Sequence, residues 1–165
     1  MSIPHDAMML AMELHKDQKR KYTHEPYWKH LAEVAGIVAT VEEFYGQLGD
    51  VAVATAWLHD AVEDQELNPK YLKRYFGPEI EMGVMLLSDL EEGNRATRKR
   101  LSRERLSASP GWVQTIKCAD LISNTSSIVM HDPDFAKVYL EEKRLLLDVM
   151  SEANPQLRQL AYSML

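Results

Sequence analysis

Apolar residues recur along the chain at intervals of three and four, which is the spacing of one face of an α-helix. Two clear runs are Val51, Ala54, Leu58 and Val62, and Val138, Leu145 and Val149, in which Val138 and Leu145 lie two helical turns apart. We find no convincing run in which apolar and polar residues alternate with the period of two that marks a half-buried strand. The pattern therefore predicts an all-α fold, a compact helical bundle.

Prolines mark where these helices begin, because proline suits the first helical turn when a capping residue precedes it. The pairs of this kind are Asn68-Pro69, Ser109-Pro110, Asp132-Pro133 and Asn154-Pro155. In Gly77-Pro78 the glycine can end one helix and the proline can open the next. Helices are expected near residues 4–19, 28–45, 50–64, 69–76, 78–88, 97–107, 110–128, 133–151 and 155–164, and the segment 89–109 is the least regular.

Length and composition indicate one folded domain over residues 1–165. The chain is 45% hydrophobic and 27% charged, close to the globular average, and it contains no long linker or internal repeat. The formal net charge of -6 argues against a nucleic-acid partner, which requires clustered cations over an extended face. A single cysteine, Cys118, and the lack of a secretory signal or membrane span predict a cytoplasmic protein with no membrane partner.

Candidate chemistry centres on His59-Asp60, two polar residues inside the apolar segment Val51–Val62. Glu63 and Asp64 follow at a spacing of four, so one continuous helix would place all four side chains on adjoining rows. Carboxylates crowded in this way repel one another, and a divalent cation relieves that repulsion. The alternative is structural: a buried His–Asp pair, with Glu63 and Asp64 at a solvated helix end.

Two further residues extend the candidate metal site. His30 follows the expected helix start at Pro26-Tyr27, and Asp120 lies in the apolar string Ile116-Lys117-Cys118-Ala119-Asp120. Two histidines with two aspartates mix nitrogen and oxygen ligands, which suits Mn²⁺, Fe²⁺ or Zn²⁺ better than Mg²⁺. Such a site can lower the pKa of a bound water and neutralise charge on a phosphoryl group.

These motifs together resemble a known family. Tyr27-Trp28-Lys29-His30, the block from Thr55 to Asp64, and Ile116–Asp120 with Asn124 occur in the order and spacing of the Rel/Spo hydrolase domain of the HD superfamily. Across nearly its full length the chain is similar to the small stand-alone alarmone hydrolases. The resemblance implies an HD-type helical domain that acts as a metal-dependent phosphohydrolase.

Carried over position by position, the resemblance implies a Mn²⁺ ion bound by His30, His59, Asp60 and Asp120. It implies that Glu63 and Asp64 orient or activate the attacking water, and that Arg20, Lys21 and Asn124 bind the nucleotide. For Arg20 and Lys21 a solvated helix end is an equal alternative. The basic run 95–105 is either a phosphate-attracting rim or an exposed charged face.

The expected substrate is a small nucleotide, with the 3′-diphosphate of a guanosine alarmone such as ppGpp as the first hypothesis. The sequence departs from the family at Leu31, where a proline is usual, and at Ser126 and Ser127, where an arginine and a threonine are common. Two alternatives therefore stay open. One is a related phosphohydrolase that removes the 2′-phosphate of NADPH or cleaves an adenosine alarmone, and the other is a nucleotide-binding module without catalysis. The sequence predicts no oligomeric state.

Overall fold

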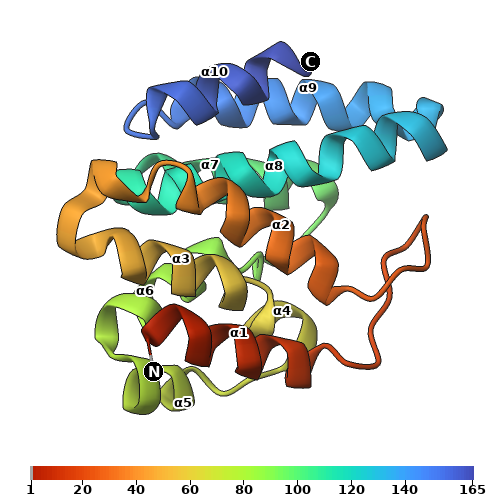
Figure 1. The fold of residues 1–165 in the computed structure, drawn as a ribbon. Coiled ribbons are helices and arrows are strands. Elements are labelled where there is room, and N and C mark those ends of the chain that lie inside the picture. Colours follow the sequence, from red (N-terminus) through yellow and green to blue (C-terminus); the bar gives the residue numbers. More distant parts are fainter. Residues whose placement is uncertain (1) are drawn as a thin grey trace. The chain divides into compact units, whose positions relative to one another are not determined.

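The computed structural model describes residues 2–165, most of which are helical (Figure 1). The elements are α1 (Ile3–Leu14), α2 (Trp28–Ala39), the 3-10 helix η1 (Glu42–Leu48), α3 (Gly49–Leu58), α4 (Ala61–Gln65), α5 (Pro69–Phe76), α6 (Pro78–Leu87), α7 (Arg95–Ser107), α8 (Gly111–His131), α9 (Pro133–Val149) and α10 (Pro155–Ser163). Within residues 2–165 the β-structure is limited to one isolated bridge, Lys19 to Pro26. The all-α prediction is confirmed. No helix in this part of the chain is long and apolar enough to cross a membrane.

The helices fall into two compact units, one ending at Ser88 and the other beginning at Asp89. The first contains α1 to α6 and the second α7 to α10. That residues 1–165 fold as one domain stays a prediction, and the two units are described in turn.

In the first unit α3 lies between α1 and α2 and packs against both (Figure 1). It is apolar on almost every side, with Ala52, Ala54, Ala56 and Leu58 fully buried, as expected of a helix enclosed by its neighbours. α5 and α6 pack as a pair below it. Gly77 joins them with φ at 96°, a left-handed conformation that glycine adopts without steric cost.

Three predicted helices of this unit are shorter or interrupted. The helix expected over 4–19 ends at Leu14, because the residues after it are mostly charged and have no apolar face to bury. The helix expected over 28–45 ends at Ala39 and continues as η1. The helix expected over 50–64 breaks between Leu58 and Ala61, at the His59-Asp60 pair.

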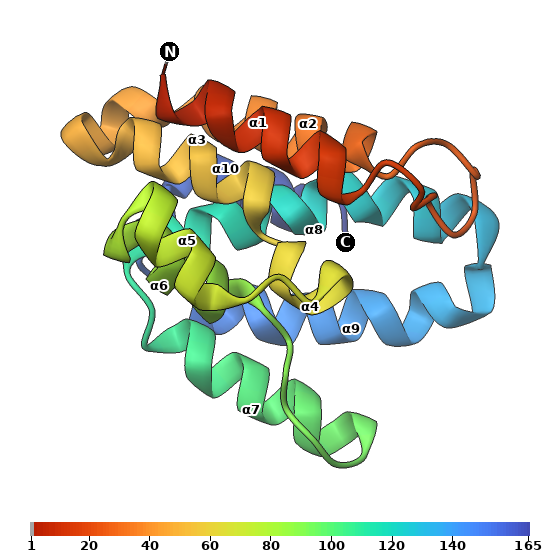
Figure 2. The same cartoon turned by 90° about the horizontal axis from the view of Figure 1, so that it is seen from below.

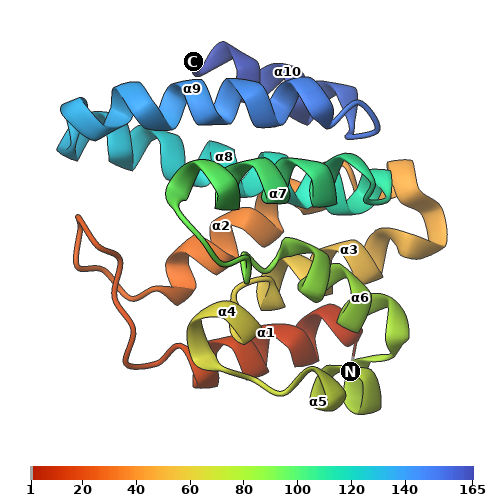
Figure 3. The same cartoon turned by 180° about the vertical axis from the view of Figure 1, so that it is seen from behind.

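In the second unit the long helix α8 packs against α9 and α10, while α7 lies along α9 (Figures 2 and 3). The predicted caps hold for two helices, since Asp132 accepts from the Phe135 amide at 3.2 Å and Asn154 from the Gln156 amide at 3.0 Å. The predicted cap at Ser109 is wrong. Its hydroxyl donates to the Arg105 carbonyl at 2.8 Å, and Pro110 itself precedes the first residue of α8.

Candidate metal centre

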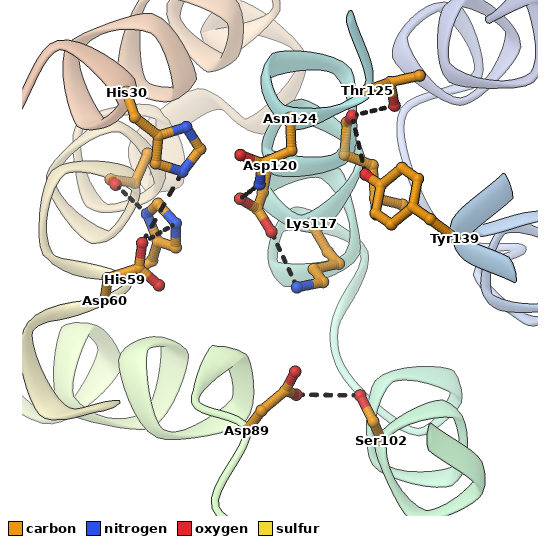
Figure 4. A network of polar contacts seen from close by, with 12 residues as sticks. His30, His59, Asp60, Asp89, Ser102, Lys117, Asp120, Asn124, Thr125 and Tyr139 are labelled. Carbon is orange, nitrogen blue, oxygen red and sulfur yellow. Dashed lines mark hydrogen bonds and ion pairs between the residues drawn. The ribbon is translucent and has the colours of Figure 1, made fainter. Parts of the chain in front are cut away.

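The break between α3 and α4 positions His59 and Asp60. Leu58 ends α3, and Asp60 has φ -98° and ψ 1° just before α4 begins at Ala61. The expectation that His59, Asp60, Glu63 and Asp64 share one continuous helix is therefore wrong. Because the helix is interrupted here, the two adjacent side chains turn toward α2 instead of diverging around a helix axis (Figure 4).

His30 on α2 completes a cluster with these two residues. Their ligand atoms all lie within 4.8 Å of one another. Nε2 of His59 is 3.1 Å from Oδ2 of Asp60, and Nε2 of His30 is 3.8 Å from the same oxygen. The imidazoles are almost fully enclosed, with His30 1% and His59 2% exposed. Two buried nitrogens converging on one carboxylate oxygen form a donor set that suits a transition-metal ion.

Hydrogen bonds outside the cluster orient the donors. Nδ1 of His59 lies 2.7 Å from the Ala56 carbonyl, an acceptor, so Nδ1 carries a proton and Nε2 is the nitrogen that faces Asp60 and is placed to coordinate a metal. The Tyr27 hydroxyl donates to Oδ2 of Asp60 at 2.7 Å. Such outer contacts fix the tautomer and the angle of metal ligands, so His30, His59 and Asp60 fit a divalent metal.

Asp64 on α4 is held by a separate set of amides. Nε2 of Gln18 donates to its Oδ2 at 3.0 Å, and Nε2 of Gln65 donates to Oε1 of Gln18 at 2.7 Å. Loss of part of its water shell and the nearby charge of Asp60 raise the pKa of Asp64 above its usual range. A carboxylate with a raised pKa is a better proton acceptor. Glu63 lies on the same short helix and is exposed.

The structure places Arg20 and Lys21 in the loop between α1 and α2, not at the end of a helix. Backbone hydrogen bonds tie this loop together, from the Arg20 amide to the Glu25 carbonyl at 2.9 Å and from the Tyr27 amide to the Gln18 carbonyl at 2.9 Å. Lys21 is exposed, with its amine 5.0 Å from the centre of the Tyr22 ring. Their binding of a nucleotide stays a prediction.

Asp120 and Asn124 lie on α8, in the second unit. Nζ of Lys117 donates to Oδ2 of Asp120 at 2.9 Å, and Nδ2 of Asn124 donates to Oδ1 at 2.9 Å, so both carboxylate oxygens are oriented (Figure 4). Because Asp120 belongs to the other unit, its place as a fourth metal ligand stays a prediction.

Lys117, Asp120 and Asn124 line a cavity of about 190 Å³ within the second unit. Its other walls come from the start of the unit, α7, α8 and α9: Asp89, Arg95, Lys99, Ser102, Arg103, Leu121, Tyr139, Glu142, Lys143 and Leu146. A water molecule takes about 30 Å³ in the liquid, so the cavity has room for a group larger than a few waters. Its lining carries more cations than anions, which favours an anionic ligand.

The basic residues of the run 95–105 lie on different faces of the helix α7. Arg95, Lys99 and Arg103 recur every four residues and line the cavity, whereas Arg100 points to solvent and pairs with Glu104 at 2.6 Å. Arg100 therefore matches the alternative of an exposed charged face, while attraction of phosphate by the members that line the cavity stays a prediction. Burial raises the pKa of Asp89, but Lys117, Arg105 and Lys99 outweigh it and leave that pKa below its usual range.

Sequence reasoning missed three residues that position the candidate groups: Gln18, Tyr27 and Lys117. Tyr27 lies three residues before His30 and Lys117 three before Asp120, a spacing that brings side chains together on a helix. That signal was available for Lys117. No comparable signal marks Gln18, which contacts Asp64 across 46 positions of sequence.

Comparisons with known proteins agree with this geometry. The HD domain family matches residues 7–111. GTP pyrophosphokinase rsh of Brucella melitensis biotype 1 is 30% identical over 145 residues, 84% of this chain but only 18% of the relative. Guanosine-3′,5′-bis(diphosphate) 3′-pyrophosphohydrolase MESH1 of Drosophila melanogaster is 30% identical over 129 residues, 78% of this chain and 70% of the relative.

A solved structure has the same fold. It is described as a metazoan ortholog of SpoT that hydrolyses ppGpp, and it superposes with a TM-score of 0.86 at 24% identity, covering 99% of this chain and 94% of its own. The expected resemblance is confirmed by the family match over more than half of the chain and by the Drosophila relative. This chain belongs to the HD domain family.

Proposed function

We propose that this chain is a metal-dependent phosphohydrolase that cleaves the 3′-diphosphate of guanosine alarmones, ppGpp or pppGpp, to GDP or GTP and pyrophosphate. The buried convergence of His30, His59 and Asp60 carries the proposal. The Drosophila relative, of which the chain covers 70%, is named for this reaction. A cytoplasmic location, and the absence of nucleic-acid and membrane partners, stay predictions.

The metal we propose is Mn²⁺, held by His30, His59, Asp60 and, from the second unit, Asp120. A divalent ion at such a site makes a coordinated water more acidic and offsets charge on the attacked phosphoryl group. Mixed imidazole and carboxylate donors favour a transition metal over Mg²⁺. Tyr27 keeps Asp60 in place, because its hydroxyl already donates to the carboxylate at 2.7 Å.

Asp64 is the proposed proton acceptor. Water attacks the phosphorus bonded to the 3′ oxygen, and the bond from that phosphorus to the 3′ oxygen breaks. Asp64 takes a proton from the water and returns it to the departing 3′ oxygen, which leaves as a hydroxyl, and pyrophosphate is released. Its carboxylate suits this role, because it lies close enough to Asp60 to interact with the charge of that residue, and the Gln18 amide holds it in place at 3.0 Å.

The test is release of pyrophosphate from ppGpp by metal-stripped protein, with and without added Mn²⁺. We expect turnover only with the metal, a loss of about 10²–10⁴-fold in Asp64→Asn as for removal of a general base, and complete loss in His59→Ala. His131→Ala is the matched control, because His131 is exposed at the end of α8. It should retain full activity.

A panel of nucleotides, including NADPH and an adenosine alarmone, decides the substrate. Metal-dependent turnover of another nucleotide without turnover of ppGpp would overturn the alarmone substrate and keep the hydrolytic site. Tight binding of ppGpp without turnover of any nucleotide would identify a binding module instead. Equal activity of His59→Ala and wild type would overturn the metal site itself.

A further inference from the structure

The cavity of the second unit contains two cations that lack an acidic partner. Its carboxylates are already engaged: Glu142 with Arg95 at 2.7 Å, Asp120 with Lys117 at 2.9 Å, and Asp89 with Arg105 at 2.6 Å. Among residues 2–165 no Asp or Glu pairs with Arg103 or Lys143, although both line the cavity. The cavity thus has positive charge that the protein leaves uncompensated.

Lys143 is the more unusual of the two, because it is only 1% exposed. Its ammonium donates to the Thr125 hydroxyl at 2.7 Å, and this hydroxyl donates in turn to the Leu121 carbonyl at 2.6 Å. Thr125 on α8 faces Tyr139 on α9 at this end of the unit (Figure 4). An ammonium group has three N–H donors, so one neutral hydroxyl leaves most of its hydrogen-bonding capacity unused.

Such an arrangement is costly in the protein alone. A buried ammonium that lacks an anionic partner loses its hydrogen bonds to water, and the protein does not replace them with interactions of equal strength. Burial also lowers the pKa of Lys143 to about 8. The group is still mostly protonated at pH 7. An anion that entered the cavity would supply the missing partner and offset this cost.

We propose that Lys143, with Arg103 at the cavity wall, binds a phosphoryl group of the nucleotide within the second unit. The inference rests on the proposed function for the identity of the nucleotide, and on the cavity for the phosphoryl group. Lys143 acts as a point charge for phosphate oxygens, while the half-buried Arg103 adds a planar pair of donors. The site therefore favours ligands that place a phosphate next to Lys143 and Arg103 over ligands that lack this phosphate.

The first experiment measures the binding of inorganic pyrophosphate to residues 1–165 by calorimetry at pH 7. A chelator is present, so that metal ions do not bridge the anion to the protein. We expect Lys143→Met to weaken pyrophosphate binding by about 10-fold, the value of one charge-assisted hydrogen bond. Lys137→Met is the matched control, since Lys137 is exposed on the same helix and its loss changes the net charge equally. It should bind as the wild type does.

The second experiment measures hydrolysis of ppGpp by the same variants. Lys143→Met should raise KM by about 10-fold with little change in kcat, because the group binds the ligand and does not touch the reacting atoms. Arg103→Gln should also weaken the binding of pyrophosphate. Since Arg103 is half-buried, this variant still tests the site if Lys143→Met does not fold by circular dichroism.

The outcomes separate the two proposals. Pyrophosphate binding that depends on Lys143 in a protein that does not hydrolyse ppGpp would support the site and overturn the alarmone function. Hydrolysis of ppGpp with unchanged KM and unchanged pyrophosphate affinity in both Lys143→Met and Arg103→Gln would overturn the site and leave the function. Lack of pyrophosphate binding by the wild type at millimolar concentration would also overturn it.

Discussion

The side-chain amide of Gln18 has only one orientation that satisfies its neighbours. Its oxygen accepts from Nε2 of Gln65 at 2.7 Å and lies 2.6 Å from Nδ1 of His15, so its nitrogen must face Asp64. In Gln18→Glu the two accepted hydrogen bonds can persist, while the donor to Asp64 becomes a second negative oxygen. We expect kcat for ppGpp to fall by about 10–100-fold, which is less than the 10²–10⁴-fold contribution of a general base, because the base is impaired but still present.

Two further measurements on Gln18→Glu separate positioning from general damage. The KM for ppGpp and the affinity for Mn²⁺ should stay close to the wild-type values, because neither His30, His59 nor Asp60 loses a contact. Gln47→Glu makes the same chemical change on an exposed residue of η1 and should leave kcat unaltered. A wild-type kcat in Gln18→Glu would show that Asp64 needs no positioning by this amide.

The buried amine of Lys143 makes stability depend on pH with a defined sign. Its pKa is about 8 in the folded protein, against 10.5 for the ordinary lysine value. Between these pH values the unfolded chain keeps a proton that the folded protein releases. The contribution of Lys143 to the free energy of unfolding therefore increases with pH, by at most about 1.4 kcal/mol per pH unit. Burial raises the pKa of the neighbouring Cys118 and Tyr139 to about 12, which acts in the opposite direction.

The comparison of variants isolates the lysine. Unfolding by urea at pH 7, 8, 9 and 10 should show that the wild type gains stability relative to Lys143→Met as pH increases above 8. Both proteins are compared in a Cys118→Ala background, because the charges of Cys118 and Lys143 interact and the contribution of the thiol would not cancel. The contribution of Tyr139 is common to both proteins and cancels in the difference. A difference that stays constant from pH 7 to 10 would mean that Lys143 keeps its ordinary pKa.

Individual helices were predictable where the sequence carries both a period and a boundary. α5 and α9 begin at the predicted prolines, and α5 has its predicted bounds, because Asn68, Asp132 and the proline after each act locally. The break at His59 was not predictable in this way. The helical spacing of apolar residues continues from Val51 to Val62 without a gap, so it does not indicate the break. The break is seen only in the structure, where His30 on α2 lies close to Asp60.

The candidate metal cluster shows the same limit. Its three residues were predictable, since polar residues in apolar surroundings need a partner and the motifs resemble a known family. The contacts that orient them were not, because the partner of Asp64 lies 46 positions away and that of Asp60 33 positions away. Lys143 was overlooked for a related reason, as a lysine in an amphipathic helix normally faces solvent.

At the scale of the whole molecule, the chain forms two compact units, yet the match to the HD domain family runs from residue 7 to residue 111 and so crosses their boundary after Ser88. A segment shared by a family in this way is expected to fold as a whole. Each unit on its own would also bury a smaller fraction of its surface than residues 1–165 do together, because that fraction rises with chain length. We therefore expect one cooperative unfolding transition for residues 1–165.

The chain supplies a reporter for each unit. Trp28 and Trp57 lie in the first and Trp112, which is 5% exposed, in the second. In a Trp28→Phe, Trp57→Phe double variant, the fluorescence of Trp112 follows the second unit alone, while circular dichroism follows all helices. Coincident urea transitions by both signals, and by modification of the buried Cys118 thiol, are expected for a single domain. Loss of the Trp112 signal at a urea concentration that leaves about half of the helicity intact would instead show that the two units unfold independently.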